Sequence, residues 1–250
     1  MDALDALEWK HKGEARSWWP KFVFHYTALE NAVSILKSGM LYSRREAERK
    51  GLLVTDVASA SVLSNTSRDH RRHVRLYFRP KTPTQFSNEG IRPAQSIRYG
   101  AHCPVPVFFL FDSGDLLTRK STQFSDGSLA GYNPGRIGDT GKFFESLPFQ
   151  QIYHNTWFKE EEKQEIVARR HAEVIVPDEL DLDSLRFIWC RSEAEKETLG
   201  SHAYPDDAPP PTAGEDPAPE DPKNGLANKK VHKQTQSHCW DDSRHRTHYS

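Results

Sequence analysis

One glutamate, Glu173, stands where an apolar strand is expected to begin, and its carboxylate is well suited to chemistry. The strand continues through Val174 and Val176, and Arg170 comes shortly before it. Glutamate is depleted in strands, and because side chains alternate, Glu173 should face away from the two valines, against a core or a cleft. Such a carboxylate can accept a proton or stabilise a positively charged transition state. A structural alternative is an ion pair with Arg170 or with a residue of a neighbouring strand.

A second polar group, His25-Tyr-Thr27, ends an earlier strand predicted over residues 21–25. Thr27 and Glu30 have the spacing of a capping box, which predicts a helix that starts here and ends at Gly39. Side chains and backbone groups at such a strand end are open to a small molecule, so His25 could hydrogen-bond a ribose hydroxyl. The structural alternative is that Thr27 caps the helix and His25 has no role.

Basic residues gather between residues 68 and 98, although the whole chain is nearly neutral, with 34 Lys and Arg against 35 Asp and Glu. Aromatic rings are interleaved with them at Tyr77 and Phe78. Rings stack on unpaired bases at about 1–3 kcal/mol each and cations hold phosphates, which suits a single-stranded nucleic acid. The alternative is an edge strand whose arginines face solvent. The basic residues are Arg68, Arg71, Arg72, Arg75, Arg79, Lys81, Arg92 and Arg98.

Short strands and helices alternate irregularly along the first 204 residues. The sequence has no regular strand–helix–strand repeat and no glycine fingerprint of a dinucleotide fold or a P-loop. We therefore expect an α+β fold with a compact mixed sheet. Strands are predicted at residues 74–78, 105–111, 173–176 and 185–190, helices at 2–17, 44–50, 160–170 and 192–199, and a long loop at 124–141.

The last part of the chain differs in composition from the rest. Proline and acidic residues fill residues 205–222, and a polar segment rich in histidine and basic residues follows. A segment with so little apolar surface cannot offset the entropy lost on ordering, so disorder is predicted. The chain is therefore expected to form one domain over residues 1–204, followed by a tail over residues 205–250.

Several classes of protein are excluded by the sequence. No apolar run reaches the roughly 20 residues of a membrane-spanning helix, and the N-terminus lacks the apolar core of a secretion signal. The 3 cysteines, an odd number, argue against a disulfide scaffold and fit a reducing compartment. We therefore expect a cytoplasmic protein without membrane contact. His and Cys residues form no convincing metal site, and no metal is expected.

The sequence resembles the DarT family of DNA ADP-ribosyltransferases over roughly residues 20–200. The resemblance is carried by four segments that occur in the same order, residues 25–39, 79–85, 124–127 and 170–176. The resemblance implies the ADP-ribosyltransferase fold, a split mixed β-sheet with flanking helices that grips NAD⁺. It implies transfer of ADP-ribose from NAD⁺ to a base of single-stranded DNA, with release of nicotinamide. It also implies a monomeric toxin, often used in phage defence and paired with a macrodomain antitoxin that removes the modification.

The resemblance assigns roles to individual residues. Glu173 takes the place of the catalytic glutamate, and Arg68 is the nearest candidate for the catalytic arginine, which also binds NAD⁺. The alternatives for this arginine are Arg72, Arg75 and Arg79. Members of the family often have a histidine shortly after the Phe-Ser-Asp turn. In this sequence the corresponding position lies near Ser128 and has no histidine. Thymine and guanine therefore both stay open as the modified base. The other residues expected to bind NAD⁺ are His25, Thr27, Asn31 and Gly39. The residues expected to contact DNA are Arg75, Tyr77, Arg79, Asp126 and Ser128.

A glutamate and an arginine suit this reaction. Nicotinamide is a good leaving group, so the enzyme mainly has to stabilise a ribosyl oxocarbenium ion. The carboxylate of Glu173 can hold the ribose 2′-hydroxyl, offset the positive charge and deprotonate the attacking base nitrogen, while an arginine holds the pyrophosphate. Two alternatives stay open. The same fold could act on RNA, a tRNA phosphate or a protein, or the chain could be a non-enzymatic nucleic-acid-binding module in which Glu173 is structural.

Overall fold

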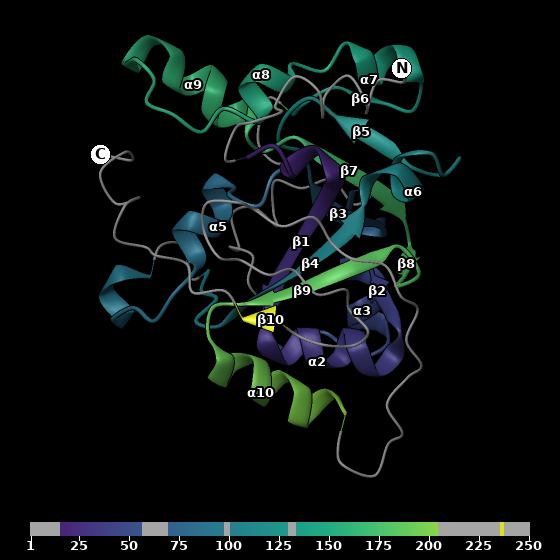
Figure 1. The fold of residues 1–250 in the computed structure, drawn as a ribbon, viewed down its shortest axis with the longest axis vertical. Helices are drawn as coiled ribbons and strands as arrows, with labels where there is room; N and C mark the ends of the chain where they lie inside the picture. Colours follow the sequence, from purple (N-terminus) through teal and green to yellow (C-terminus); the bar gives the residue numbers. More distant parts are fainter. Residues whose placement is uncertain (1–15, 57–69, 98–100, 130–133, 205–235, 238–250) are drawn as a thin grey trace.

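The computed structural model describes residues 16–56, 70–97, 101–129, 134–204 and 236–237. An eight-stranded sheet runs through the molecule, and helices flank it (Figure 1). Neighbouring strands are antiparallel except for the last two in the chain, which are parallel. In pairing order the strands are β10 (Gln236–Ser237), β9 (Leu185–Cys190), β4 (Pro106–Asp112), β1 (Phe22–Ala28), β3 (His73–Tyr77), β7 (Glu173–Pro177), β5 (Gln123–Ser125) and β6 (Ile137–Gly138). A separate pair consists of β2 (Met40–Tyr42) and β8 (Glu179–Asp181).

The large sheet is split between β1 and β3. All seven residues of β1 pair with β4, whereas β1 and β3 share one residue pair, Phe24 with Tyr77. On the far side of the split, β3 pairs along its whole length with β7. The two halves of the sheet are therefore joined by one residue pair and diverge from it, which confirms the expected α+β fold with a split sheet.

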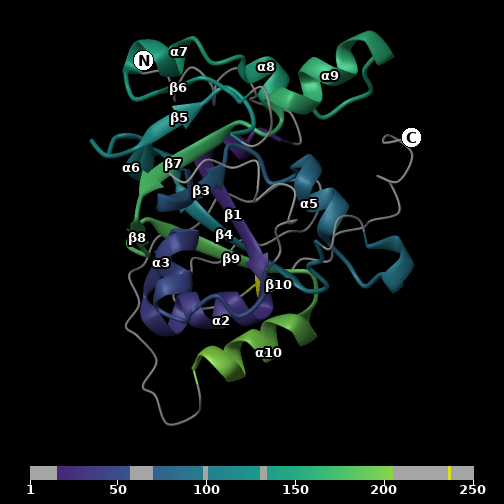
Figure 2. The same cartoon turned by 180° about the vertical axis from the view of Figure 1, so that it is seen from behind.

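The helices gather at two opposite ends of the molecule (Figures 1 and 2). At one end, α2 (Leu29–Ser38) and α10 (Glu193–Ala203) pack against each other. At the other end, α7 (Gly141–Glu145), α8 (Phe149–Ile152) and α9 (Glu160–Arg169) lie near β5 and β6. The remaining helices are α3 (Arg44–Arg49), α5 (Pro83–Asn88), α6 (Ser113–Leu117) and the 3-10 turns η1 (Trp19–Lys21), η2 (His70–Arg72) and η3 (Ala94–Ser96).

Alternation along the strands divides the core between the two faces of the sheet. Val174 and Val176 belong to the larger cluster, which also contains the buried apolar residues of α2. A second cluster, on the opposite face, is mostly aromatic and packs against Tyr77. Since Tyr77 is paired with Glu173, the glutamate lies on this aromatic face, as its alternation with the valines predicts. The buried members of the second cluster are Phe24, Tyr26, Phe108, Leu110, Phe187 and Trp189.

Helix α2 starts later than the sequence predicts. Its N-cap is Ala28, and no side chain caps it, so the capping box of Thr27 and Glu30 is wrong. The reason is that pairing with β4 extends β1 to Ala28 and keeps Thr27 in the strand. The Thr27 hydroxyl instead accepts a hydrogen bond from Asn31 Nδ2, at 3.2 Å. At the other end Gly39 has a φ of 68°, the left-handed conformation that glycine adopts easily, as predicted for the helix end.

The segment predicted as one long loop, residues 124–141, contains a hairpin. Phe124 of β5 is paired with Gly138 of β6. The two arms approach so closely at Gly135 that a Cβ there would lie 2.8 Å from the backbone nitrogen of Gly127. The glycines that suggest a loop therefore permit close approach of two backbone segments.

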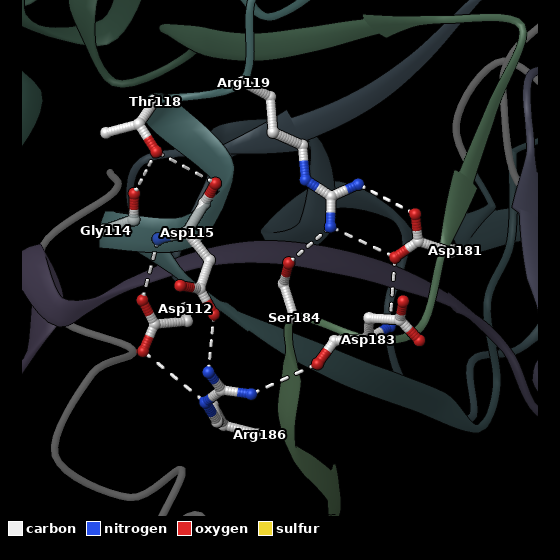
Figure 3. A network of polar contacts seen from close by, with 9 residues as sticks. All are labelled: Asp112, Gly114, Asp115, Thr118, Arg119, Asp181, Asp183, Ser184 and Arg186. Atoms are coloured by element: carbon white, nitrogen blue, oxygen red, sulfur yellow. Dashed lines mark hydrogen bonds and ion pairs between the residues drawn. The ribbon is translucent and has the colours of Figure 1, made fainter.

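A network of ion pairs joins α6, β8 and the start of β9 (Figure 3). Arg119 donates to both carboxylate oxygens of Asp181, at 2.9 and 3.1 Å, and to Ser184 Oγ, at 2.7 Å. Arg186 donates to Asp115 Oδ2, at 2.5 Å. The carboxylates paired with these arginines are those of Asp112, Asp115 and Asp181. Asp183 joins the network through its backbone N–H and carbonyl. Acidic groups outnumber the two arginines, and the arrangement fixes a corner of the fold.

Two predicted segments lie largely outside the described residues. These are the helix over residues 2–17 and the tail over residues 205–250. Within the tail, residues 236–237 form β10, because the edge of β9 offers backbone hydrogen bonds to a further strand. The segment predicted to be disordered, residues 205–222, lies outside the described residues, so that expectation stays a prediction. Among the described residues, no helix is long and apolar enough to cross a membrane.

Candidate active site

Glu173 is the first residue of β7 and lies between β3 and β5. It is 1% exposed. Its backbone N–H donates to Ser125 Oγ, at 3.0 Å, and that hydroxyl donates to the carbonyl of Gly127, at 2.8 Å. These bonds fix the start of β7 against β5. Ser125 is a site residue that was not predicted, although it lies in the Phe-Ser-Asp-Gly turn that the sequence pattern indicates.

Arg75 of β3 holds the carboxylate of Glu173. Its Nε and one of its Nη atoms donate to the two carboxylate oxygens in a paired arrangement. Burial by itself lowers the pKa of Arg75, but the charge and hydrogen bonds of Glu173 raise it above its ordinary value, so the guanidinium stays charged. The ion pair with a neighbouring strand, foreseen as the structural alternative, is therefore present. Since 25% of the Arg75 side chain is exposed, the pair reaches the surface on the arginine side.

Tyr77 is paired with Glu173 across the ladder between β3 and β7. Its ring is half-buried and stacks on that of Tyr26, with the centroids 6.5 Å apart. Burial, followed by the negative charge of Glu173, raises the pKa of Tyr77 above its ordinary value. The phenol is therefore neutral at physiological pH and forms an aromatic wall beside the carboxylate.

His25 reaches the same arginine from β1. Its Nδ1 lies 3.1 Å from the carbonyl oxygen of Arg75. A carbonyl oxygen can only accept, so Nδ1 carries the hydrogen and Nε2 is left as an acceptor. Burial lowers the pKa of His25 below 6.5, and the hydrogen bond to Arg75 opposes this only partly, so the ring is neutral at pH 7. His25 and Glu173 are thus attached to one residue, through its carbonyl and its guanidinium.

The side chains of His25 and Glu173 point to opposite faces of the sheet. Glu173 shares a face with Tyr77 and Phe24, because paired residues point to the same side. His25 follows Phe24 along β1 and points to the other side, where its ring centroid lies 6.4 Å from that of Phe109. A molecule that touches both groups therefore has to lie across the split between β1 and β3.

Within the described residues, the predicted nucleotide-binding residues in and around α2 make no hydrogen bond with Glu173. Asn31 Nδ2 donates to Thr27 Oγ1 and, at 2.7 Å, to the carbonyl of Thr55, while its Oδ1 accepts from two backbone N–H groups of residues 54–55. The amide is thus engaged inside the chain. Gly39 lies beyond the far end of the ten-residue helix, which is about 15 Å long. Binding of NAD⁺ by Thr27, Asn31 and Gly39 stays a prediction from the resemblance.

The expectation that Arg79 contacts DNA is wrong, and so is its candidacy as the catalytic arginine. It is 1% exposed. Its Nη1 donates to the carbonyls of Ile152 and His154, at 3.1 and 2.6 Å, and its guanidinium lies 5.1 Å from the ring centroid of Trp19. The physical reason is that the chain leaves β3 before this residue, so the alternation that would expose Arg79 no longer applies.

Replacing Arg79 with methionine is therefore expected to destabilise the fold without acting on DNA. Two carbonyls lose charged hydrogen-bond donors, at a cost of about 2–4 kcal/mol in the free energy of unfolding. Urea unfolding measures the loss, and oligonucleotide affinity is measured at a temperature where the variant is folded. A tenfold loss of DNA affinity with unchanged stability would contradict this structural role.

Asp126 organises the hairpin and does not face outward. Its side chain is 3% exposed and accepts from the backbone N–H and Nε of Arg136, both at 2.8 Å. Arg169 Nη1 lies 3.1 Å from the same carboxylate. A carboxylate enclosed by two arginines is unavailable to DNA, so the predicted direct contact is wrong. Ser128 is half-buried, and its carbonyl accepts from the N–H of Gly135, so its own contact with DNA stays a prediction.

Of the candidate arginines, Arg75 is the one that the described part of the chain places on Glu173. Arg68 lies outside the described residues, and its catalytic role and its contact with NAD⁺ stay predictions. Arg72 is exposed, with its Nε 3.8 Å from Asp178 Oδ1. The described residues contain no group of three or more His, Cys, Asp and Glu that could hold a metal ion.

Lowering the pH below about 6.5 is expected to destabilise the fold. Burial is the largest cause of a lowered pKa at His25, His154 and His171. In this window the unfolded chain binds protons that the folded chain resists, so stability is full above pH 6.5 and falls below it. The loss is about 1.4 kcal/mol per pH unit for each proton taken up. Urea unfolding across this range measures the slope, and His171→Gln should flatten it. Stability that rises on acidification would contradict the expectation.

Comparisons with known proteins agree with this geometry. The family model described as DarT, ssDNA thymidine ADP-ribosyltransferase, matches residues 24–211. Thermus sp. 2.9 DarT in complex with ADP-ribosylated ssDNA has a TM-score of 0.59 and 16% identity, covering 73% of this chain and 87% of that chain. The same protein in complex with NAD⁺ gives 0.56 and 15%, covering 73% and 88%. Thermosipho africanus DarTG in complex with ADP-ribose gives 0.55 and 18%, covering 74% of this chain and 48% of that chain. No curated protein matches the chain.

These findings bear on fold and family in different ways. At 15–18% identity, the solved structures establish a shared fold. The family model extends over most of the chain and includes both His25 and Glu173. The early strand, the split of the sheet and the glutamate at the start of β7 all lie within the matched region. The chain therefore belongs to the DarT family of ssDNA thymidine ADP-ribosyltransferases.

Proposed function

We propose that this chain transfers ADP-ribose from NAD⁺ to thymidine in single-stranded DNA, with Glu173 as the catalytic carboxylate. The observation that carries this role is the fixed position of Glu173, which is held by Arg75 and Ser125 beside the split of the sheet. A carboxylate that is oriented before the substrate binds needs no reorganisation to stabilise a positive charge. The activity is the one that names the family.

In the proposed reaction, the bond between ribose C1″ and the nicotinamide nitrogen breaks, and nicotinamide leaves with the bonding electrons. The ribosyl group becomes positively charged, and the carboxylate of Glu173 offsets that charge while it accepts a hydrogen bond from a ribose hydroxyl. A ring nitrogen of thymine then bonds to C1″ and loses its proton to Glu173. Arg75 acts as a positioning residue, because its paired hydrogen bonds orient the carboxylate.

We infer that NAD⁺ lies across the split between β1 and β3. The Nε2 acceptor of neutral His25 suits a ribose hydroxyl, which can donate to it. Thr27 and Asn31 support this side of the site by fixing the junction of β1 and α2, and Gly39 and Arg68 are assigned by the resemblance alone. Structures of Thermus sp. 2.9 DarT in complex with NAD⁺ and carba-NAD⁺ support NAD⁺ as the donor.

We infer a single-stranded substrate, because a paired and stacked base cannot reach a buried carboxylate. The half-buried ring of Tyr77 beside Glu173 offers a surface on which thymine can stack. Arg75 is committed to Glu173, so it acts on DNA through the carboxylate and not through a phosphate. The structure of Thermus sp. 2.9 DarT in complex with ADP-ribosylated ssDNA supports this acceptor.

We also propose that the protein is a monomeric toxin that acts on cytoplasmic DNA and is opposed by a macrodomain antitoxin. ADP-ribose attached to a base obstructs pairing, so a cell that survives the enzyme needs an activity that removes the group. The similarity to Thermosipho africanus DarTG, solved with ADP-ribose, supports the pairing. Growth arrest on expression, relieved by an ADP-ribosyl hydrolase, is the expected result.

The activity is tested by incubating the full chain with labelled NAD⁺ and oligonucleotides. A single strand that contains thymidine should become labelled, and the same strand without thymidine should not. Mass spectrometry of the digested nucleosides identifies the modified base. Label on RNA or protein would contradict the proposed acceptor, and NAD⁺ consumption without a labelled polymer would indicate a glycohydrolase.

A further inference from the structure

We propose that Arg136 and Arg169 bind a backbone phosphate of the DNA strand beside the modified thymidine. This inference rests on the proposed function, because it assigns a contact to the proposed substrate. Arg136 stands directly before β6, and Arg169 is the last residue of α9. The two guanidinium groups meet on one carboxylate, that of Asp126.

Neither guanidinium uses all of its donors within the described residues. Arg136 donates to Asp126 through its backbone N–H and Nε, and its two terminal amino groups make no hydrogen bond there. Arg169 donates through Nη1 to the carbonyl of Asp126, at 2.9 Å, and its Nε and Nη2 make no hydrogen bond there. The Arg136 side chain is 71% exposed and that of Arg169 is 31% exposed. Accessible donors on two fixed guanidinium groups suit a phosphate, which accepts paired hydrogen bonds.

The balance of charge separates this pair from the other arginine cluster described above. One buried carboxylate faces two guanidinium groups, which leaves a surplus positive charge. In the network of Figure 3, two arginines pair with three carboxylates, which leaves a surplus of negative charge. The side chain of Arg119 in that network is 29% exposed, which is close to the exposed fraction of Arg169. Unlike Arg169, however, Arg119 donates to both carboxylate oxygens of one aspartate, Asp181. The pair of Arg136 and Arg169 can therefore attract an anion, whereas the network of Figure 3 repels one.

The position of the pair favours DNA as the source of the phosphate. Asp126 follows Ser125, whose hydroxyl holds the backbone of Glu173. In the sheet, the hairpin of β5 and β6 lies on one side of β7, and β1 with His25 lies on the other. Since NAD⁺ is proposed on the His25 side, the acceptor strand has to approach Glu173 from the hairpin side. The pyrophosphate of NAD⁺ shares the same chemistry, and the test below distinguishes the two.

The test uses Arg136→Gln and Arg169→Gln as single variants of the full chain. Each variant leaves Asp126 paired with the other arginine, so folding is retained, and thermal unfolding verifies this. Each should raise the KM for a thymidine-containing single strand about tenfold and lower the dependence of log affinity on log salt by about 0.7. The KM for NAD⁺ should not change. Arg119→Gln, from the network of Figure 3, removes an arginine of similar exposure and should leave the KM for the oligonucleotide unchanged.

A second oligonucleotide, with neutral methylphosphonate linkages beside the thymidine, tests whether the two arginines bind the charge of the phosphate. It should bind the parent chain about tenfold more weakly than the ordinary oligonucleotide, whereas Arg136→Gln should bind both equally. Unchanged oligonucleotide affinity in both single variants overturns the proposal, and so does a rise in KM confined to NAD⁺. If the parent chain binds the oligonucleotide without transferring ADP-ribose, the proposed function fails, while the methylphosphonate comparison still decides the phosphate contact.

Discussion

Replacing Glu173 with glutamine is expected to lower the rate of ADP-ribosyl transfer to single-stranded DNA about a thousandfold, because charge stabilisation and proton acceptance are lost together. Glutamine keeps the shape of the side chain and can still accept a hydrogen bond from Arg75. It has no negative charge to offset the oxocarbenium ion and no basic oxygen to take the proton of thymine. The rate is measured with saturating labelled NAD⁺ and a thymidine-containing oligonucleotide.

The matched control is Asp181→Asn, which also removes a carboxylate from a paired hydrogen-bond arrangement with an arginine, Arg119, in the network of Figure 3. This variant should transfer ADP-ribose at the parent rate, because its carboxylate belongs to a structural corner. Oligonucleotide affinity of Glu173→Gln should stay near that of the parent chain. Because glutamine accepts one of the two hydrogen bonds from Arg75, transfer is measured at a temperature where the variant is folded, which thermal unfolding verifies. Full activity in Glu173→Gln would remove the catalytic assignment.

Replacing Arg75 with methionine is expected to destabilise the fold by about 3 kcal/mol at neutral pH, because it leaves the buried carboxylate of Glu173 without its cation. This loss is at the lower end for a buried ion pair, since part of the Arg75 side chain is exposed. Transfer activity should also fall, because nothing then orients the carboxylate. Urea unfolding of the variant and the parent chain measures the difference.

A double variant separates the charge from the packing. Glu173→Gln combined with Arg75→Met removes both charges, and it should regain much of the stability lost in Arg75→Met alone. A double variant as unstable at neutral pH as the Arg75→Met single variant would show that the cost comes from lost packing of the arginine and not from an unpaired carboxylate.

The local predictions that held were those made by strong patterns. The apolar run at residues 105–111 predicts a buried strand, and β4 lies within one residue of it at each end. The alternation at Glu173 predicts which face of β7 it occupies, and Gly39 predicts the end of α2. Such features depend on periodicity and on backbone conformation, which are properties of neighbouring residues.

The predictions that failed depended on contacts between distant segments. Thr27 has the chemistry of an N-cap, but pairing with β4 keeps it in a strand. Arginine is usually a surface residue, but the Arg79 side chain is buried and donates hydrogen bonds to the carbonyls of Ile152 and His154. Asp126 lies in a sequence typical of an exposed turn, but two arginines enclose it.

By itself, the sequence determined the family resemblance, the α+β class and the two residues, His25 and Glu173, around which the site is built. It could not decide which of several arginines meets Glu173, because Arg68, Arg72, Arg75 and Arg79 all stand in one basic stretch. The tertiary structure decided this by register: β3 pairs with β7, and that pairing places Arg75 against the carboxylate. The physical reason is that spacing along the chain fixes the direction of a side chain, whereas its partner depends on which strands pair.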